Sequence, residues 1–198
     1  MSTSPGPYGD PQTRRLILDA TWALVEDGDS EVRLVDVAER AGVSRRAVYL
    51  HFGDRAGLLA ALVDHMDEVI DVGAVADSLW SATDPADVLA GIVEVYAHLN
   101  PRVDAVARML EGRPKDAAAR AAWRSRLETR RRVHRELLQR VSEAGALAAG
   151  WSVDGAADMV HAMMLPAVWR ELVDEVGWSI EDCRRHFTAV LRRALLEA

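Results

Sequence analysis

Arginines carry most of the groups in this chain that could recognise a charged partner, since Lys115 is the only lysine among 24 basic residues. The net charge is −7, which argues against indiscriminate binding of nucleic acid. The basic residues nevertheless concentrate in two stretches, because residues 33–55 sum to +2 and residues 113–140 to +7. Within the first stretch Arg45 and Arg46 are adjacent, and guanidinium groups donate paired hydrogen bonds to guanine or phosphate.

The second basic stretch has two interpretations. It could form a second nucleic-acid surface, or it could be one long helix with a solvated arginine face that pairs with nearby acidic residues. Arg130, Arg131 and Arg132 would point in three directions around such a helix. That arrangement favours the solvated face.

No motif of catalysis accompanies these arginines. The chain lacks a glycine-rich phosphate loop, a Gly-x-Ser-x-Gly nucleophile motif and a His-Glu-x-x-His zinc motif. Asp158 and His161 would share a helix face and could bind a metal or act as a weak dyad, although such a pair often arises by chance. The single cysteine, Cys183, excludes an internal disulfide and a cysteine zinc site. The sequence therefore predicts no enzyme, no catalytic residue, no metal and no cofactor.

Helices must position the first basic stretch, because no segment alternates apolar and polar residues as an exposed strand would. Gly42 permits a sharp turn, and Ser44 is a good N-cap for the short helix after it. Two short helices joined by a tight glycine-containing turn, with longer helices on either side, form a helix-turn-helix pattern. Val48 and Phe52 would point inward and leave the adjacent arginines exposed, as entry into the DNA major groove requires. Expected helices run from Pro11 to a stop at Gly28, over 34–41 and from Arg45 to about Leu50, and a longer helix follows the cap Asp54.

The segment Val32–Leu59, VRLVDVAERAGVSRRAVYLHFGDRAGLL, resembles the DNA-binding domain of the tetracycline-repressor (TetR) family of transcriptional regulators. The resemblance covers roughly residues 11–66, and its spacing is tight. The matching residues are Val37-Ala38, Ala41-Gly42-Val43-Ser44, Tyr49, His51-Phe52 and Leu58, with Ile17-Leu18, Ala20 and Gly28 on the preceding helix.

The resemblance implies a DNA-binding site in this segment. Arg55 replaces a lysine that is frequent in the family, which implies a phosphate contact, and Arg33 replaces a frequent threonine, exchanging a hydroxyl cap for a contact to the DNA backbone. Tyr49 could instead pack its ring on the domain and offer only its hydroxyl, and His51 could close the helix end. The implied contacts come from Arg33, Ser44, Arg45, Arg46, Tyr49, His51 and Arg55.

Beyond residue 72 the chain is helical again. Asn100–Pro101 is expected to begin a new helix, and Pro166 to kink another. Tryptophan and methionine accumulate here, and such side chains line an adaptable apolar pocket or fill an ordinary core. The resemblance implies an effector pocket in the middle helices and a dimer face from about 153–176 and 179–196. Candidate pocket residues are Trp80, Tyr96, Met109, Trp123, Met163 and Trp169.

These features predict an all-α chain with a three-helix helix-turn-helix domain and a larger helical domain. The expected parts are a disordered tail (1–10), the DNA-binding domain (11–57), a connecting helix (58–72) and an effector-binding and dimerisation domain (73–198). The implied function is a ligand-responsive repressor that binds a palindromic operator in double-stranded DNA as a homodimer and is released by a small, largely apolar effector. The alternative is a helical small-molecule-binding protein without operator-specific regulation. Because neither a membrane span nor a signal peptide is visible, a cytoplasmic protein is expected.

Overall fold

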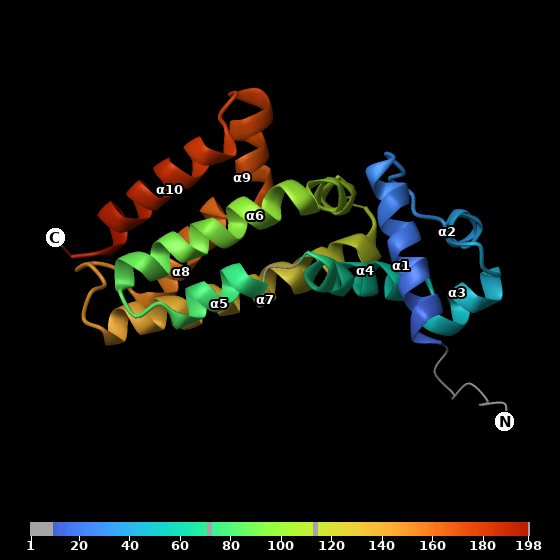
Figure 1. Ribbon diagram of the computed structural model, residues 1–198, viewed down its shortest axis with the longest axis horizontal. Helices are drawn as coiled ribbons and strands as arrows, with labels where there is room; N and C mark the ends of the chain where they lie inside the picture. Colours follow the sequence, from blue (N-terminus) through green and yellow to red (C-terminus); the bar gives the residue numbers. More distant parts are fainter. Residues whose placement is uncertain (1–9, 71–72, 113–114, 198) are drawn as a thin grey trace. The chain divides into compact units, whose positions relative to one another are not determined.

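The structure, a computed structural model, describes residues 10–70, 73–112 and 115–197 (Figure 1). Regular secondary structure in these residues is helical, and the one β-type contact is an isolated bridge between Leu147 and Leu196. The all-α class is therefore confirmed. Of the tail expected over 1–10, residues 1–9 lie outside the described residues, as do residues 71 and 72 at the end of the expected connecting helix.

The N-terminal unit consists of residues up to 69 together with residues 105–125. Its first four helices are α1 (Pro11–Glu26), α2 (Leu34–Ala41), α3 (Arg45–Phe52) and α4 (Arg55–Val69). Asp10 starts α1 by accepting the backbone N–H groups of Gln12 and Thr13, and Pro11 fits the first turn, as the sequence predicts. Helix α1 packs against α2 and α4. The core of these helices contains Ile17, Leu18, Val37, Val48, Leu58 and Leu62, each fully buried.

The C-terminal unit consists of residues 70–104 and 126–198. It contains α5 (Gly73–Ser81), most of α6 (Pro85–Glu111) and most of α7 (Ala117–Glu143). After these come α8 (Val153–Met163), α9 (Pro166–Arg170), the π-helix η1 (Glu171–Glu175) and α10 (Ile180–Leu195). Helices α6 and α7 thus contribute to both units. The expected boundary at residue 73 differs from this division, because residues 105–125 group with the N-terminal helices.

Helix α6 runs through Pro101, so the expected new helix at Asn100–Pro101 is wrong. Proline removes one N–H group from the helical ladder and usually bends or ends a helix. Here Leu99 and Val103 are both buried, so the apolar face continues across the proline. Nη1 of Arg102 also donates to the carbonyl oxygen of His98 at 2.6 Å, in the same turn. The packing of the buried face of α6 therefore outweighs the tendency of Pro101 to end the helix.

The helix expected over 153–176 is divided at the proline instead of being merely kinked. Leu165 is extended, with ψ of 137°, because the residue before proline is pushed out of the helical region. Pro166 then occupies the first turn of α9. The indole Nε1 of Trp169 donates to the carbonyl oxygen of Met163 at 3.1 Å, which satisfies a group released by the break.

Candidate nucleic-acid interface and ligand cavity

The turn between α2 and α3 forms as the sequence predicts. Gly42 ends α2 with φ of 66° and ψ of 29°, the left-handed conformation that glycine adopts without steric cost. The backbone N–H groups of Gly42 and Val43 donate to the carbonyl oxygens of Glu39 and Ala38. Oγ of Ser44 then accepts the N–H of Ala47 at 3.1 Å and starts α3. Two helices of eight residues each are thus joined through a short turn.

One face of α3 anchors it to the N-terminal unit. Val48 and Phe52 are buried, as predicted, and the guanidinium of Arg14 on α1 lies 5.5 Å from the centre of the Phe52 ring. Tyr49 is 48% exposed, so its ring is directed largely to solvent instead of being packed into the domain. His51 is half-buried, with its ring 6.0 Å from that of Phe52.

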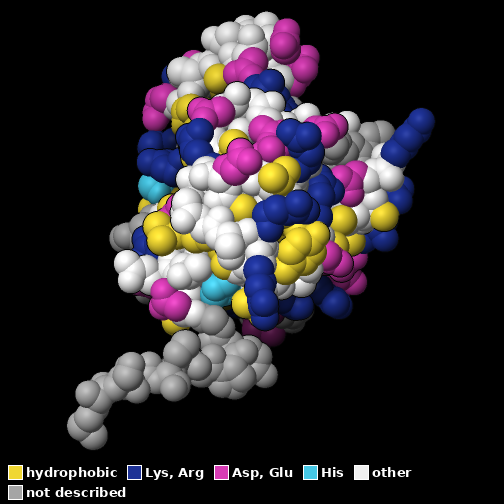
Figure 2. Space-filling model, turned by 90° about the vertical axis from the view of Figure 1, so that its right-hand side faces the viewer, with side chains coloured by type: hydrophobic (Ala, Val, Ile, Leu, Met, Phe, Trp, Pro, Cys, Tyr) yellow, Lys and Arg dark blue, Asp and Glu magenta, His cyan; other side chains and the backbone are white. Residues whose placement is uncertain are grey.

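The opposite face of α3 is open to solvent. Arg45 and Arg46 are exposed, and in the part of the chain that the structure describes their guanidinium groups have no hydrogen bond or ion pair. Figure 2 views the molecule from the side on which α1–α3 lie in Figure 1 and shows cationic side chains exposed there beside apolar ones. Leu50 is 72% exposed on this helix, and sequence reasoning missed it. The available signal was a large apolar side chain at a position that the anchors Val48 and Phe52 direct outward.

Arg33 is engaged within its own helix. It occupies the N-cap position of α2 and makes no side-chain cap, consistent with the loss of a hydroxyl. Its Nε and Nη2 atoms donate to the carboxylate of Asp36 at 2.6 and 3.1 Å. Arg33 is exposed and keeps N–H groups that Asp36 does not use, so a phosphate could share this guanidinium with Asp36 or displace it.

Arg55 is held by two other parts of the N-terminal unit. Its Nε donates to the carbonyl oxygen of Glu31 at 2.9 Å, and its Nη1 donates to Asp116 at 2.5 Å. Asp116 also accepts the N–H groups of Ala118 and Ala119 at the start of α7. Burial alone would raise the pKa of Asp116, but the hydrogen bonds from Ala119 and Arg55 outweigh it and hold that pKa below its usual value. Next to Glu31, the buried Val32 has φ of 48°, a conformation rare for a β-branched residue.

The six candidate pocket residues do not share one unit. Met109 and Trp123 are buried in the N-terminal unit, whereas the other four belong to the C-terminal unit. Trp80 is 44% exposed, with the guanidinium of Arg140 6.0 Å from its ring centre. Two of the candidates are linked directly, because the indole of Trp169 donates to the carbonyl of Met163.

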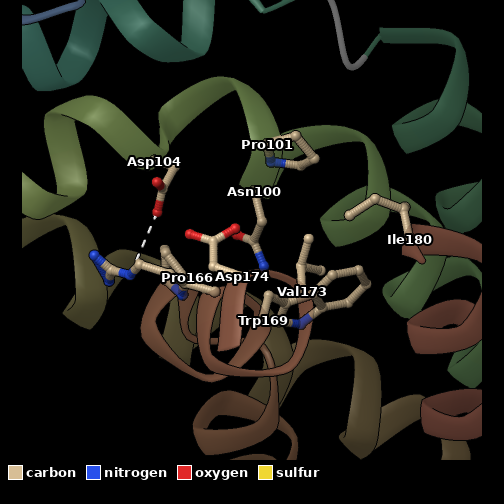
Figure 3. A pocket seen from close by; sticks show the side chains of 9 residues that line it. Asn100, Pro101, Asp104, Pro166, Trp169, Val173, Asp174 and Ile180 are labelled. Carbon is tan, nitrogen blue, oxygen red and sulfur yellow. Dashed lines mark ion pairs between the residues drawn. The ribbon is translucent and has the colours of Figure 1, made fainter. Parts of the chain in front are cut away.

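A cavity of about 200 Å³ lies in the C-terminal unit, and Trp169 is the one candidate that lines it (Figure 3). Helix α6 contributes three polar or rigid residues, and α9, η1 and α10 contribute the rest. Sequence reasoning missed these other residues, because Asn100 and Pro101 carry the signal of a helix boundary. The lining consists of Asn100, Pro101, Asp104, Pro166, Trp169, Arg170, Val173, Asp174 and Ile180.

Helix α7 differs from the expected solvated arginine helix along one face. Arg131 and Arg135 pair with Asp158 and Asp154 of α8 at 2.5 and 2.8 Å, as that interpretation predicts. Three basic side chains four residues apart are instead buried: Arg126, Arg130 and His134. The basic stretch therefore combines exposed ion pairs with a buried row, which composition alone cannot separate.

His134 on α7 is a buried histidine. Both of its ring nitrogens are buried without a hydrogen-bond partner, and its ring lies 5.4 Å from Tyr96 and 5.8 Å from His161. Burial, with the charges of His161 and Arg130, lowers the pKa of His134 to about 3. His134 is therefore neutral at pH 7 in the folded chain.

Asp158 and His161 each have a partner on helix α7. Nε and Nη2 of Arg131 hold the Asp158 carboxylate, and His161 faces His134 instead. Among the described residues no three histidine, cysteine or acidic side chains are arranged to hold a metal ion. The helices that the structure describes include none with the length and apolarity to cross a membrane.

Comparison with known proteins identifies the N-terminal part. Residues 17–62 match the model of bacterial regulatory proteins of the tetR family. The HTH-type transcriptional regulator TtgR of Pseudomonas putida is 39% identical over 75 residues, which cover 37% of this chain and 36% of TtgR. The match thus spans little more than a third of that curated relative.

Solved structures match nearly the whole chain in fold. A TetR-family transcriptional regulator from Rhodococcus sp. has a TM-score of 0.76 at 20% identity, over 94% of this chain and 100% of that one. FadR from Bacillus subtilis, in complex with stearoyl-CoA, has a TM-score of 0.74 at 17% identity, over 91% of this chain and 98% of FadR. Residues 17–62 thus match the tetR family of bacterial regulatory proteins, and nearly the whole chain shares the helical fold of these solved structures. This confirms the resemblance seen in the sequence.

Proposed function

We propose that this protein is a transcriptional regulator that binds a palindromic operator as a homodimer and places α3 in the major groove. The carrying observation is that Arg45 and Arg46 are exposed at the N-terminus of α3 while Val48 and Phe52 fix the opposite face. An anchored helix with unengaged donors meets the geometric requirement for reading base edges.

The other candidate DNA-contacting residues differ in whether their side chains already have a partner within the protein. Tyr49 and Ser44 are exposed beside the arginines and suit phosphate or base contacts, and His51 lies at the end of α3. Leu50 offers an apolar surface that matches a thymine methyl group. Arg33 would contact the DNA backbone by exchanging Asp36 for phosphate. For Arg55 the contacts favour a positioning role over the expected phosphate contact, because its guanidinium joins Glu31 to Asp116.

A homodimer is supported by apolar side chains left in solvent on the segments expected to pair. Met159 on α8 is 43% exposed, Val176 after η1 is 57% exposed, and Val190 on α10 is 50% exposed. A dimer face on these segments would remove such apolar side chains of both copies from water. Two copies would also supply two recognition helices, which one operator with two-fold symmetry requires.

We further propose that a small, largely apolar effector releases the operator, and that the protein acts as a cytoplasmic repressor. FadR of Bacillus subtilis, which shares the fold, was solved with stearoyl-CoA, which supports a ligand-binding C-terminal unit here. An effector acts only through different affinities for two conformations, and α4, the last helix of the N-terminal unit before residue 70, is the natural connection. Coupling of about 1–3 kcal/mol would change operator affinity roughly 5- to 150-fold.

Selection from a random double-stranded DNA library at physiological salt tests the DNA-binding part. A two-fold symmetric sequence should be enriched by the wild-type chain and not by a chain with Arg45→Ala and Arg46→Ala. No enrichment by the wild type would favour a helical ligand-binding protein without operator-specific regulation. For a ligand found by thermal shift, the effector part requires that ligand and operator weaken each other's binding by the same factor.

A further inference from the structure

The cavity beside Trp169 has a largely apolar lining, and most of its polar side chains can accept hydrogen bonds. Asn100 and Asp104 face it from α6, and Asp174 faces it from η1 (Figure 3). The indole N–H of Trp169, a donor that could otherwise serve a ligand, is occupied by the carbonyl of Met163. A ligand that brings a hydrogen-bond donor and an apolar body therefore matches these groups.

Asn100 is the polar group that points most directly to a ligand. Its side chain is 3% exposed, and its Nδ2 donates to the carbonyl oxygen of Met164 at 3.4 Å. That hydrogen bond fixes the orientation of the amide, because an oxygen facing the Met164 carbonyl would be repelled. The opposite atom, Oδ1, is buried and has no hydrogen-bond partner. A buried acceptor left without a partner costs free energy that a donor from a ligand would recover.

The charges around the cavity favour a cation. Asp104 and Asp174 carry two negative charges, and Arg170 carries one positive charge 3.6 Å from Asp104. The lining therefore has a net charge of −1 when a ligand is absent. The Trp169 ring adds an aromatic surface, which attracts cations and packs against apolar carbon.

The shape of η1 brings these groups together. A π-helix replaces the regular helix over Glu171–Glu175, and such segments occur mostly as single turns at functional sites. It presents both Val173 and Asp174 to the cavity, so an apolar wall and a carboxylate lie next to each other. On the α6 side Pro101 forms a rigid part of the wall.

We propose that this cavity binds a small organic cation, an amine whose apolar body contacts Trp169, Val173 and Ile180 and whose ammonium group donates to Asn100 and the carboxylates. A cavity of about 150 Å³ in another protein holds benzene, so about 200 Å³ accommodates one ring with a short aminoalkyl group. The claim that this cavity is the effector site rests on the proposed function. The claim that it binds an amine does not depend on that function.

Binding of three probes of similar shape to the whole chain, without DNA and at pH 7, tests the charge preference. The probes are benzylamine, which is protonated, benzyl alcohol, which is neutral, and benzoate, which is an anion. Titration calorimetry should give a Kd for benzylamine about ten-fold below that for benzyl alcohol, a difference of about 1.4 kcal/mol, with benzoate weakest. Benzoate binding as tightly as benzylamine, or no benzylamine binding at millimolar concentration, would overturn the proposal.

Two variants locate the site. Asp174→Asn should weaken benzylamine about five- to ten-fold and leave benzyl alcohol unchanged, because it removes a negative charge beside the ammonium group and keeps the shape of the side chain. Asn100→Leu should weaken the binding of both benzylamine and benzyl alcohol. The matched control is Asp154→Asn, which removes the same charge from a carboxylate paired with Arg135 outside the cavity. Equal effects of Asp154→Asn and Asp174→Asn on benzylamine binding would overturn the assignment. Because Asp174 is exposed, its substitution should not unfold the chain, so this comparison remains valid even if Asn100→Leu is unstable.

Adding selected operator DNA separates this inference from the proposed function. Amine binding with the expected variant pattern but unchanged operator affinity would support the cation site and contradict its effector role. Operator binding without amine binding would leave the DNA-binding proposal intact and overturn the cation site.

Discussion

At the scale of single residues, the arginines near the helix-turn-helix differ in what already holds them. Arg45 and Arg46 extend from the start of α3 without a partner among the described residues, whereas Asp36 holds Arg33 and Asp116 holds Arg55. The sequence placed all four arginines correctly in one segment. It could not separate them, because Asp116 lies 61 residues away from Arg55 along the chain.

Substituting these arginines should separate reading of bases from positioning of helices. Arg45→Ala or Arg46→Ala should cost about 1–3 kcal/mol of operator binding and relax the preference at one base position. Arg55→Ala should instead lower the free energy of unfolding by about 1–3 kcal/mol, because Asp116 is left without its charged partner. Binding to operators with single base changes and urea unfolding of each variant provide the two measurements.

The salt dependence of DNA binding decides the role of Arg55. If this guanidinium neutralised a phosphate, Arg55→Ala would reduce the slope of log K against log salt by about one. We expect that slope to stay the same and the unfolding midpoint to move. A reduced slope with unchanged stability would restore the phosphate contact that the sequence predicts.

His134 should make the protein sensitive to acid. Burial, His161 on α8 and Arg130 on α7 lower its pKa from 6.5 to about 3. Between these values the unfolded chain binds a proton that the folded chain does not, so the free energy of unfolding falls as pH drops through this window. This group alone should cost about 1.4 kcal/mol per pH unit below pH 6. His161, whose pKa burial also lowers, adds to the loss.

Urea unfolding at pH 7 and pH 5 measures this loss. His134→Phe should remove much of the difference between the two pH values, because no proton is then taken up at this position. His186, which is exposed, provides the control, and His186→Gln should leave the difference unchanged. Equal pH dependence in the wild type and His134→Phe would show that other groups control acid unfolding.

At the scale of elements, the sequence predicts helix caps and turns well, because each depends on only a few neighbouring residues. The αL conformation of Gly42 and the capping by Asp10, Ser44 and Ser179 follow from residue type alone. Local rules failed at Pro101, where the buried face of α6 carries the helix through a proline. Local rules could not predict the cavity either, because its lining comes from three separate helices and a π-helix that only the tertiary fold brings together.

Substitutions of Ser44 should separate its role as a cap from its role at the DNA. Ser44→Ala removes the acceptor for the Ala47 N–H and should cost about 1 kcal/mol of stability. Ser44→Asp retains an acceptor, so stability should change little, but its negative charge should oppose DNA phosphates and weaken binding about ten-fold. Ser44→Asn, an uncharged cap, is the control and should preserve stability. Unweakened DNA binding by Ser44→Asp would place this residue away from the phosphates.

At the scale of the whole molecule, the proposed dimer predicts a fixed spacing in its operator. Two recognition helices on one face of DNA require half-sites about one helical turn apart, or a multiple of it. Inserting about 5 base pairs between the half-sites turns one of them to the far side, so affinity should fall toward that of a single half-site. Fluorescence anisotropy with normal, lengthened and single half-site duplexes measures this, with sedimentation to establish the dimer. Tight binding of a monomer to one half-site would contradict the proposed dimer.

The joint between α3 and α4 has a mechanical consequence. A Cβ added at Gly57, in the first turn of α4, would lie 2.0 Å from the backbone oxygen of Phe52, the last residue of α3. The two backbones thus meet with no side chain between them that could yield. Because close-packed contacts yield little, we expect a rotation of α4 to move α3 with it. A methyl group at position 57 would force α3 and α4 apart. We expect this to weaken the coupling between the movements of the two helices.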